Sequence, residues 1–141
     1  MSESDLQDNL KSFLTLKDFS AKEIEEMIDL YAAADLFVLP SLRDASPLTP
    51  IEASAAGLPL LVSNLIGNYE DVLIQEVNGW GFNPYESEEA KSILLKISSL
   101  TINELSIIGE KSKSIYNETF DTELCVKSYA EQLLKTYNKL K

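Results

Sequence analysis

The pattern of hydrophobic and polar residues predicts strands that alternate with helices along most of the chain. Three short apolar runs without polar alternation, at residues 35–40, 60–63 and 79–82, are typical of parallel strands that are buried on both faces. Residues 10–16 form a fourth candidate strand. Because helical segments separate these runs, we expect an α/β fold with a partial parallel sheet of three to four strands, flanked by helices and followed by C-terminal helices.

Several local signals mark where the helices begin and end. The S/T-x-x-E pattern at residues 20–23 and 101–104 is a capping box, and Asp121 is placed to cap the last helix. Further helices are expected at residues 48–56, 67–74 and 86–99, with Gly57 ending the first of them. Apolar residues at helical spacing predict a buried face for the helix after Ser20: Ile24, Met27, Ile28, Tyr31 and Ala34.

Composition and charge narrow the classes of function. The 141 residues suffice for one domain with its own core, and 45% of them are hydrophobic. A net charge of −11 disfavours binding to nucleic acid or anionic lipid. The absence of histidine excludes Ser-His-Asp chemistry, and with a single cysteine the sequence predicts no metal site. No apolar run is long enough to span a bilayer and no signal peptide is recognisable, so we expect a cytoplasmic protein without a transmembrane segment.

The candidate chemistry lies directly after the strand at 35–40. A polar loop at residues 41–47 follows this strand and leads into the Ala-rich helix that ends at Gly57. Open α/β sheets bind their ligands in such loops, at the carboxyl ends of the strands. Asp44 and Glu52 are the two acidic residues of this unit, with seven residues between them. We therefore expect Asp44 and Glu52 to converge on a single cleft.

These residues carry a resemblance to a known family. The run YAAADLFVLPS at 31–41, then Asp44, then EASAAGLP at 52–59, resembles the donor-site signature of family 4 retaining glycosyltransferases of the GT-B fold, the sugar group 1 transferase type. That signature has two Glu residues separated by seven residues, and here Asp44 stands in place of the first. The resemblance extends through Gly67, Glu70 and residues 78–84. It implies a Rossmann-like sheet and a nucleoside diphosphate sugar as donor substrate, with no other cofactor.

The resemblance assigns roles to the residues of the loop and the helix. Glu52 would accept hydrogen bonds from the ribose diol, and Asp44 would accept them from the hexose, although Asp44 is one methylene shorter than the family's Glu. The backbone N–H groups of Leu48 and Thr49 would hold the diphosphate at the helix N-terminus, where unpaired donors and the helix dipole favour anions. These assignments make Asp44 and Glu52 the candidate catalytic residues.

Four further residues complete the candidate site. Arg43 is the basic residue nearest the loop, and Ser46 could donate its hydroxyl to the ligand. Gly67 and Glu70 match the family's Gly-Gly-x-x-Glu segment, in which Asn68 replaces the second glycine.

Structural interpretations of the same residues remain open. Thr49 and Glu52 also fit a capping box with Pro50 at the start of the helix. Asp44 is equally interpreted as a solvated partner of Arg43. Ser46 could serve as an N-cap instead of a ligand donor, and Glu70 as a first-turn residue that complements its helix dipole.

The resemblance covers the C-terminal part of a donor-binding domain, so we expect this chain to lack the early strands and the N-terminal acceptor domain. The strand at 35–40 would then be an open edge of the sheet, to be covered by residues 10–16, by a missing N-terminal half or by a second copy of the chain. On this basis we expect a nucleotide-sugar-binding domain from a pathway such as polysaccharide biosynthesis, and we expect it to be incomplete and inactive as an enzyme on its own. The alternative is a non-catalytic assembly module that uses the same fold and its open edge.

Overall fold

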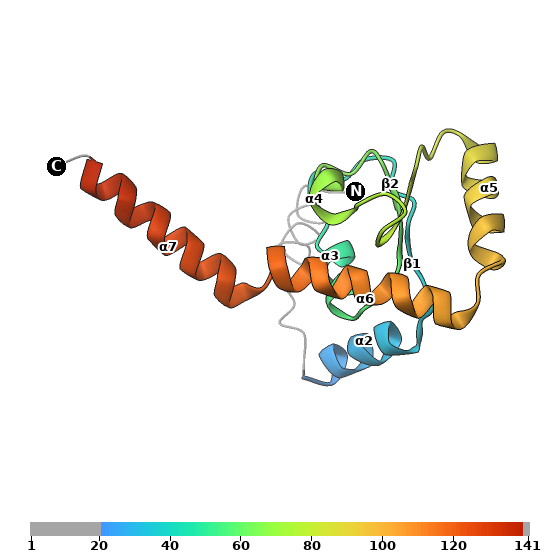
Figure 1. Cartoon of the computed structure of the whole chain (residues 1–141), viewed down its shortest axis with the longest axis horizontal. Coiled ribbons are helices and arrows are strands. Elements are labelled where there is room, and N and C mark those ends of the chain that lie inside the picture. The colour runs from blue at the N-terminus through green and yellow to red at the C-terminus, as the bar shows by residue number, and fades with distance from the viewer. Residues whose placement is uncertain (1–20, 140–141) are drawn as a thin grey trace, which may run out of the picture. The chain divides into compact units, whose positions relative to one another are not determined.

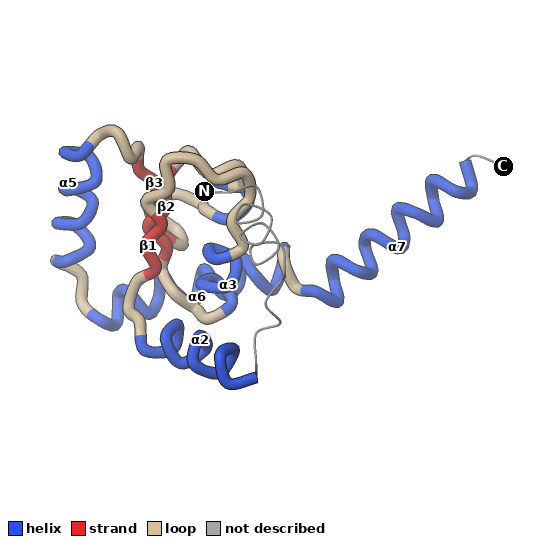
Figure 2. The backbone as a smooth tube through the Cα atoms, turned by 180° about the vertical axis from the view of Figure 1, so that it is seen from behind, coloured by secondary structure: helices blue, strands red, loops and turns tan. Residues whose placement is uncertain are grey.

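A computed structural model describes residues 21–139 (Figures 1 and 2). The chain divides after Leu30 into two compact units, and the sheet lies in the unit that begins at Tyr31. The elements in order are α2 (Ala21–Ala33), β1 (Phe37–Leu39), α3 (Thr49–Ala55), β2 (Leu60–Ser63), α4 (Tyr69–Val72), β3 (Gly79–Phe82), α5 (Ser87–Ser98), α6 (Ile102–Thr119) and α7 (Thr122–Lys139). The expected α/β fold class is confirmed, with each predicted helix present. The candidate strand at 10–16 lies outside the described residues.

The three strands form one parallel sheet in the order β1-β2-β3, drawn in red in Figure 2. Phe37 lies opposite Leu60, and Leu60 lies opposite Gly79. Two of the strands have the bounds that their apolar runs predicted, and the first is shorter than its run. Among the strands that the structure describes, β1 and β3 are the edges of the sheet.

The core lies on both faces of this sheet. Successive residues of β2 point to opposite faces, which is why Leu60, Leu61 and Val62 are all apolar. Leu60 and Val62 are fully buried in a cluster with residues of α3 and α4. Leu61 is buried with Trp80 in a second cluster, which residues of α5 and α6 complete. Figure 1 shows α5 on one side of the strands and α3 on the other.

Caps and close contacts fix the helices that surround the sheet. Thr101 and Glu104 form the predicted capping box at the start of α6, and the Asp121 carboxylate accepts the backbone N–H groups that open α7. Gly57 follows the end of α3 with φ of 80°, a conformation that favours glycine. At the contact between α3 and α6, a Cβ on Gly109 would lie 2.0 Å from the carbonyl oxygen of Gly57, so only glycine allows this approach.

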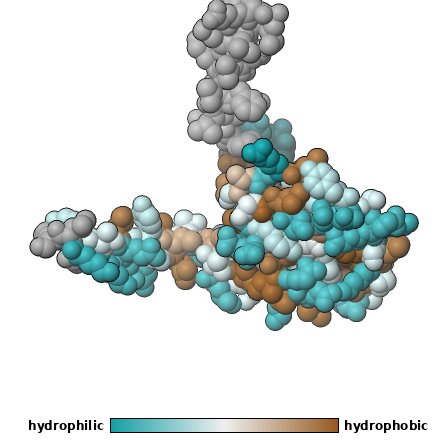
Figure 3. Space-filling model, turned by 90° about the horizontal axis from the view of Figure 1, so that it is seen from above, coloured by the Kyte–Doolittle hydropathy of each residue, from teal (hydrophilic) through white to brown (hydrophobic). Residues whose placement is uncertain are grey.

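Apolar side chains are exposed on two of the described helices, α2 and α7. Tyr31 in α2 and Ala34 just after it pack against the core, as expected. The expected burial of the other three residues is wrong, because Ile24, Met27 and Ile28 are 38–59% exposed. Helical spacing identifies residues that share a face but does not supply a partner for that face. In α7, the side chains of Val126, Tyr129 and Leu133 are also exposed. Figure 3 shows hydrophobic residues interspersed with hydrophilic ones on the molecular surface.

Within residues 21–139, no single helix combines the length and the hydropathy needed to cross a bilayer. One bent pair, Ser87–Ser98 with Ile102–Tyr137, meets these criteria when the two helices are taken together, with a bend of 113° between them.

Candidate functional site

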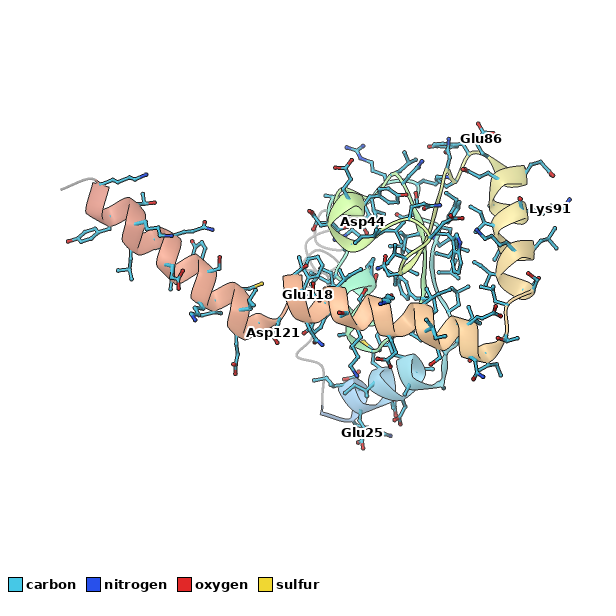
Figure 4. All side chains as sticks on the ribbon, viewed as in Figure 1. Glu25, Asp44, Glu86, Lys91, Glu118 and Asp121 are labelled. Carbon is cyan, nitrogen blue, oxygen red and sulfur yellow. The ribbon has the colours of Figure 1, made fainter. Side chains whose placement is uncertain are left out.

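Backbone contacts join the loop at 40–48, which follows β1, to the loop at 64–68, which follows β2. These two segments are called the clasped loops. The N–H of Gly67 donates to the carbonyl oxygen of Asp44 at 2.9 Å, and Asp44 pairs with Ile66 in a parallel backbone bridge. A Cβ on Gly67 would lie 1.9 Å from the carbonyl oxygen of Ala45, so the approach requires a glycine. The contact brings the predicted site residues Asp44 and Gly67 into one place, beside the segment that enters α4 (Figure 4).

Asn68 makes a second connection between the same loops. Its side chain is buried, and its Nδ2 donates to the carbonyl oxygen of Pro47 at 3.0 Å. Pro47 is itself buried, so this carbonyl depends on Asn68 for a hydrogen bond in the described structure. The Oδ1 atom of Asn68 is buried without a partner. The residue that replaces the family's second glycine therefore holds the loop just before α3.

The Asp44 side chain turns back onto its own loop. Its Oδ1 accepts the backbone N–H of Ser46 at 3.2 Å, in a local turn typical of Asp. No ion pair joins Asp44 to Arg43 among the described residues, and Arg43 is exposed. The expected pairing of these two side chains is therefore wrong, since the backbone N–H of Ser46 takes the carboxylate instead. In the described structure the second carboxylate oxygen of Asp44 makes no hydrogen bond.

The start of α3 presents unpaired backbone donors. Leu48 is the N-cap residue, no side chain caps the helix, and Pro50 stands in its first turn. Two capping expectations are thus wrong: Ser46 lies outside the cap, and Thr49 is already helical, which places it beyond the capping position. Within residues 21–139, the N–H groups of Leu48 and Thr49 have no backbone acceptor. These two groups are available to an anion at this end of the helix.

Glu52 is held by a residue from another element. The hydroxyl of Tyr31, in the last turn of α2, donates to Oε2 of Glu52 at 2.9 Å. The capping-box interpretation of Glu52 is wrong, because its carboxylate bonds this hydroxyl and leaves the helix N-terminus open. Burial raises the pKa of Tyr31 to about 12, with further contributions from the hydrogen bond to Glu52 and from its charge. Tyr31 therefore remains a donor throughout the physiological pH range.

Glu70 lies in the first turn of α4 and is exposed. There it complements the helix dipole, as one interpretation of the sequence expected. It also lines a surface pocket of about 280 Å³ with Gly67, Asn64 and Asp71. The pocket adjoins the clasped loops, so Glu70 and Gly67 lie together. Within the described part of the chain, no group of three His, Cys, Asp or Glu side chains could hold a metal ion.

Sequence reasoning missed the roles of Tyr31 and Asn68. The spacing of Tyr31 marks it as an apolar position of its helix, and its hydroxyl carries no local signal of a contact with Glu52. Asn68 departs from the family pattern, and this departure provides a buried amide that donates to the carbonyl of Pro47. The structure gives Asp44 and Glu52 different hydrogen-bond partners, so their convergence on one ligand remains a prediction.

Comparison with protein families identifies the chain. The model of the family described as "Glycosyl transferases group 1" matches residues 14–117, a segment that contains the sheet, both loops and α3. This chain belongs to the group 1 glycosyltransferases. The resemblance drawn from the donor-site signature is therefore confirmed.

Relatives of known structure have the GT-B glycosyltransferase fold. Sucrose-phosphate synthase from Thermosynechococcus elongatus is 25% identical, with a TM-score of 0.63 over 79% of this chain and 26% of that protein. Anabaena Alr3699/HepE, solved in complex with UDP and glucose, is 25% identical, with a TM-score of 0.64 over 74% of this chain and 28% of that protein. The predicted partial Rossmann-like sheet of a GT-B protein is thus confirmed.

Curated relatives are also longer than this chain. An Escherichia coli UDP-Gal:alpha-D-GlcNAc-diphosphoundecaprenol alpha-1,3-galactosyltransferase is 42% identical over 60 residues, which are 43% of this chain and 14% of that enzyme. An uncharacterized glycosyltransferase from Methanocaldococcus jannaschii is 30% identical over 90 residues, which are 63% of this chain and 23% of that protein. This group 1 glycosyltransferase chain therefore spans less than a third of the relatives described here.

Proposed function

We propose that this chain is the nucleotide-sugar-binding part of a group 1 glycosyltransferase and that its donor is a UDP-sugar. The observation that carries the proposal is the family match across both clasped loops and α3. Supporting it, Anabaena HepE binds UDP and glucose, and the E. coli relative is named for UDP-Gal. The proposed site lies at the carboxyl ends of β1 and β2, where open α/β sheets bind nucleotides.

The diphosphate would be bound by backbone groups in this proposal. The chain carries a net charge of −11, so the overall field repels an anion and local donors must offset that repulsion. The unpaired N–H groups of Leu48 and Thr49 are such donors. Arg43 and the hydroxyl of Ser46 are both exposed beside them and complete the proposed set.

The carboxylates would bind the hydroxyl groups of the donor. Glu52, one turn into α3, accepts from the ribose diol, while Asp44 and Glu70 accept from the sugar. A carboxylate offers two oxygens and several lone pairs, which suits a vicinal diol. Asp44 keeps one oxygen without a described partner, and Glu70 is exposed beside its pocket, so both can accept from a ligand.

Transfer of the glycosyl group with retention is proposed for the longer protein to which such a domain belongs. Negative charge develops on the leaving diphosphate, and cationic groups must stabilise it in the transition state. Arg43 is the sole basic residue of the loop at 41–47, which is too little for that task. An acceptor domain and further cations are therefore expected from another part of the protein. A serotype-specific mannosyltransferase among the relatives supports a role in polysaccharide biosynthesis.

Titration calorimetry with UDP tests the proposal. We expect weak binding by the unmodified chain and roughly tenfold weaker binding by Glu52→Ala, since hydrogen bonds to a charged group are worth about 1.5–3 kcal/mol. Glu86→Ala is the matched control, because Figure 4 shows Glu86 at the start of α5, well apart from Asp44. Absence of UDP binding, or an equal loss in the two variants, would contradict the site.

A second candidate function is that of an assembly module formed by two copies of the chain. The exposed apolar side chains of α7, at Val126, Tyr129 and Leu133, favour it. Size-exclusion chromatography with light scattering distinguishes the two functions. An obligate dimer that does not bind UDP supports the assembly module, and a monomer that binds UDP supports the donor site.

A further inference from the structure

The hydrogen bond between Tyr31 and Glu52 joins two elements that are far apart in the sequence. Tyr31 lies in the last turn of α2 and Glu52 in the first turn of α3, and their side chains meet in a partly buried position. The hydroxyl of Tyr31 takes one lone pair of Oε2. In the described structure, Oε1 of Glu52 has no partner, so the remaining acceptor positions of the carboxylate are free for a ligand.

The Tyr31 ring is itself held by packing. It belongs to the residues that border the buried cluster of Leu60 and Val62, and its ring centre lies 6.3 Å from that of Phe37 in β1. A tyrosine ring has few rotatable bonds, whereas a glutamate side chain has several and loses more conformational entropy when it is fixed. The hydrogen bond therefore restrains the flexible Glu52 carboxylate, because the tyrosine that donates it is held against the sheet.

We propose that Tyr31 is a positioning residue that holds the Glu52 carboxylate in the orientation that accepts the ribose diol of the nucleotide. The inference rests on the proposed function of Glu52 and adds that Tyr31 orients the Glu52 carboxylate before the nucleotide binds. With the carboxylate already oriented, the ligand does not have to fix the side chain when it binds. Tyr31 need not touch the nucleotide in this arrangement.

A purely structural role is the alternative, in which the bond does no more than tie α2 to α3. The two roles differ in what removal of the hydroxyl affects. If Tyr31 positions Glu52, loss of the Tyr31 hydroxyl weakens only the part of the affinity that comes from the ribose hydroxyls. If its role is structural, the same loss weakens the binding of any nucleotide at this site. Comparison of UDP with 2′-deoxy-UDP therefore separates them.

The experiment measures the affinity of the full chain for UDP and for 2′-deoxy-UDP by titration calorimetry. Four proteins are compared: the unmodified chain, Tyr31→Phe, Glu52→Gln and the double variant. A fifth, Tyr129→Phe, removes the same hydroxyl from an exposed position of α7 and is the matched control. Tyr31→Phe keeps the ring that packs against Phe37, and thermal unfolding confirms that each variant is folded.

We expect the unmodified chain to prefer UDP over 2′-deoxy-UDP roughly tenfold. Tyr31→Phe should lose most of this preference while its affinity for 2′-deoxy-UDP stays within about twofold. The Tyr31 change should have little further effect in the Glu52→Gln background, because the two residues act through one contact. Equal weakening of both nucleotides by Tyr31→Phe, or an unchanged preference, overturns the positioning role.

A second measurement uses the unmodified chain, so that it does not depend on the stability of a variant. With tyrosine rings labelled for NMR, UDP should shift the ring signals of Tyr31 more than 2′-deoxy-UDP does, and those of Tyr129 should stay in place. Equal shifts with both nucleotides contradict the inference. If UDP does not bind at all, or if the unmodified chain shows no ribose preference, the proposed role of Glu52 fails first and the inference falls with it. A ribose preference that Tyr31→Phe keeps overturns the inference alone.

Discussion

The contact between Gly67 and Ala45 gives the sharpest prediction about the site. In Gly67→Ala, the new Cβ would lie 1.9 Å from the carbonyl oxygen of Ala45, which is backbone and cannot rotate away. The loops must separate, and the bond from the Gly67 N–H to the Asp44 carbonyl weakens. Overpacking costs about 1–3 kcal/mol and the bond contributes about 0.5–1.5 kcal/mol, so we expect a loss of about 2–4 kcal/mol in the free energy of unfolding.

Equilibrium unfolding in urea measures this loss. With an m-value of about 1–3 kcal/mol/M, the midpoint should fall by roughly 1 M or more. Gly57→Ala is the control, because a Cβ there meets atoms no closer than 3.9 Å and the cost of about 1 kcal/mol comes from its positive φ alone. A change below about 0.5 kcal/mol in Gly67→Ala would refute the close contact between the loops.

Three further predictions concern individual contacts. Asn68→Ala leaves the buried carbonyl of Pro47 without its donor and should cost about 1–3 kcal/mol in urea unfolding; an unchanged midpoint would show that water replaces the amide. Thr101→Ala removes the cap of α6 and should cost about 0.5–2 kcal/mol, and thermal unfolding without a lower midpoint would contradict the capping box. The pKa of Tyr31 is raised from 10.0 to about 12, so its contribution is complete below pH 10 and is lost as the pH rises through 12. After allowance for solvent screening, the free energy of unfolding of the unmodified chain should fall by about 1–2 kcal/mol between pH 10 and pH 12. The free energy of unfolding of Tyr31→Phe should fall less over the same range. Identical pH profiles for the two proteins would contradict the raised pKa.

Features that depend on local pattern could be predicted from the sequence. The continuous apolar run at 60–63 predicted a strand with the bounds of β2, because a strand covered on both faces has no polar side. The capping box at 101–104 and Gly57 gave the ends of two helices, since each signal acts through backbone groups within a few residues. Ser20, which begins the other predicted capping box, lies outside the described residues. The edge position of β1 among the described strands agrees with the open edge that the family resemblance implied for residues 35–40.

Features that depend on distant contacts could not be predicted. Residues 49–52 fit a capping box, but the helix begins at Leu48 without a side-chain cap, and Glu52 turns to Tyr31. No local pattern reveals that a hydroxyl from another helix reaches this carboxylate. Likewise, the need for Gly67 arises from a carbonyl in a different loop, which becomes visible when the two strands are placed side by side. The site is thus assembled from contacts between loops, on a sheet that the sequence specifies locally.

The central claim is that a nucleotide binds at the carboxyl ends of β1 and β2. Mapping of amide chemical shifts on addition of UDP tests this most directly. The account predicts that the largest changes fall in residues 44–49, at Glu52 and in residues 66–70. Changes concentrated instead around Gly57 and Leu105, which line a separate pocket, or shifts absent from all amides at saturating UDP, would contradict it.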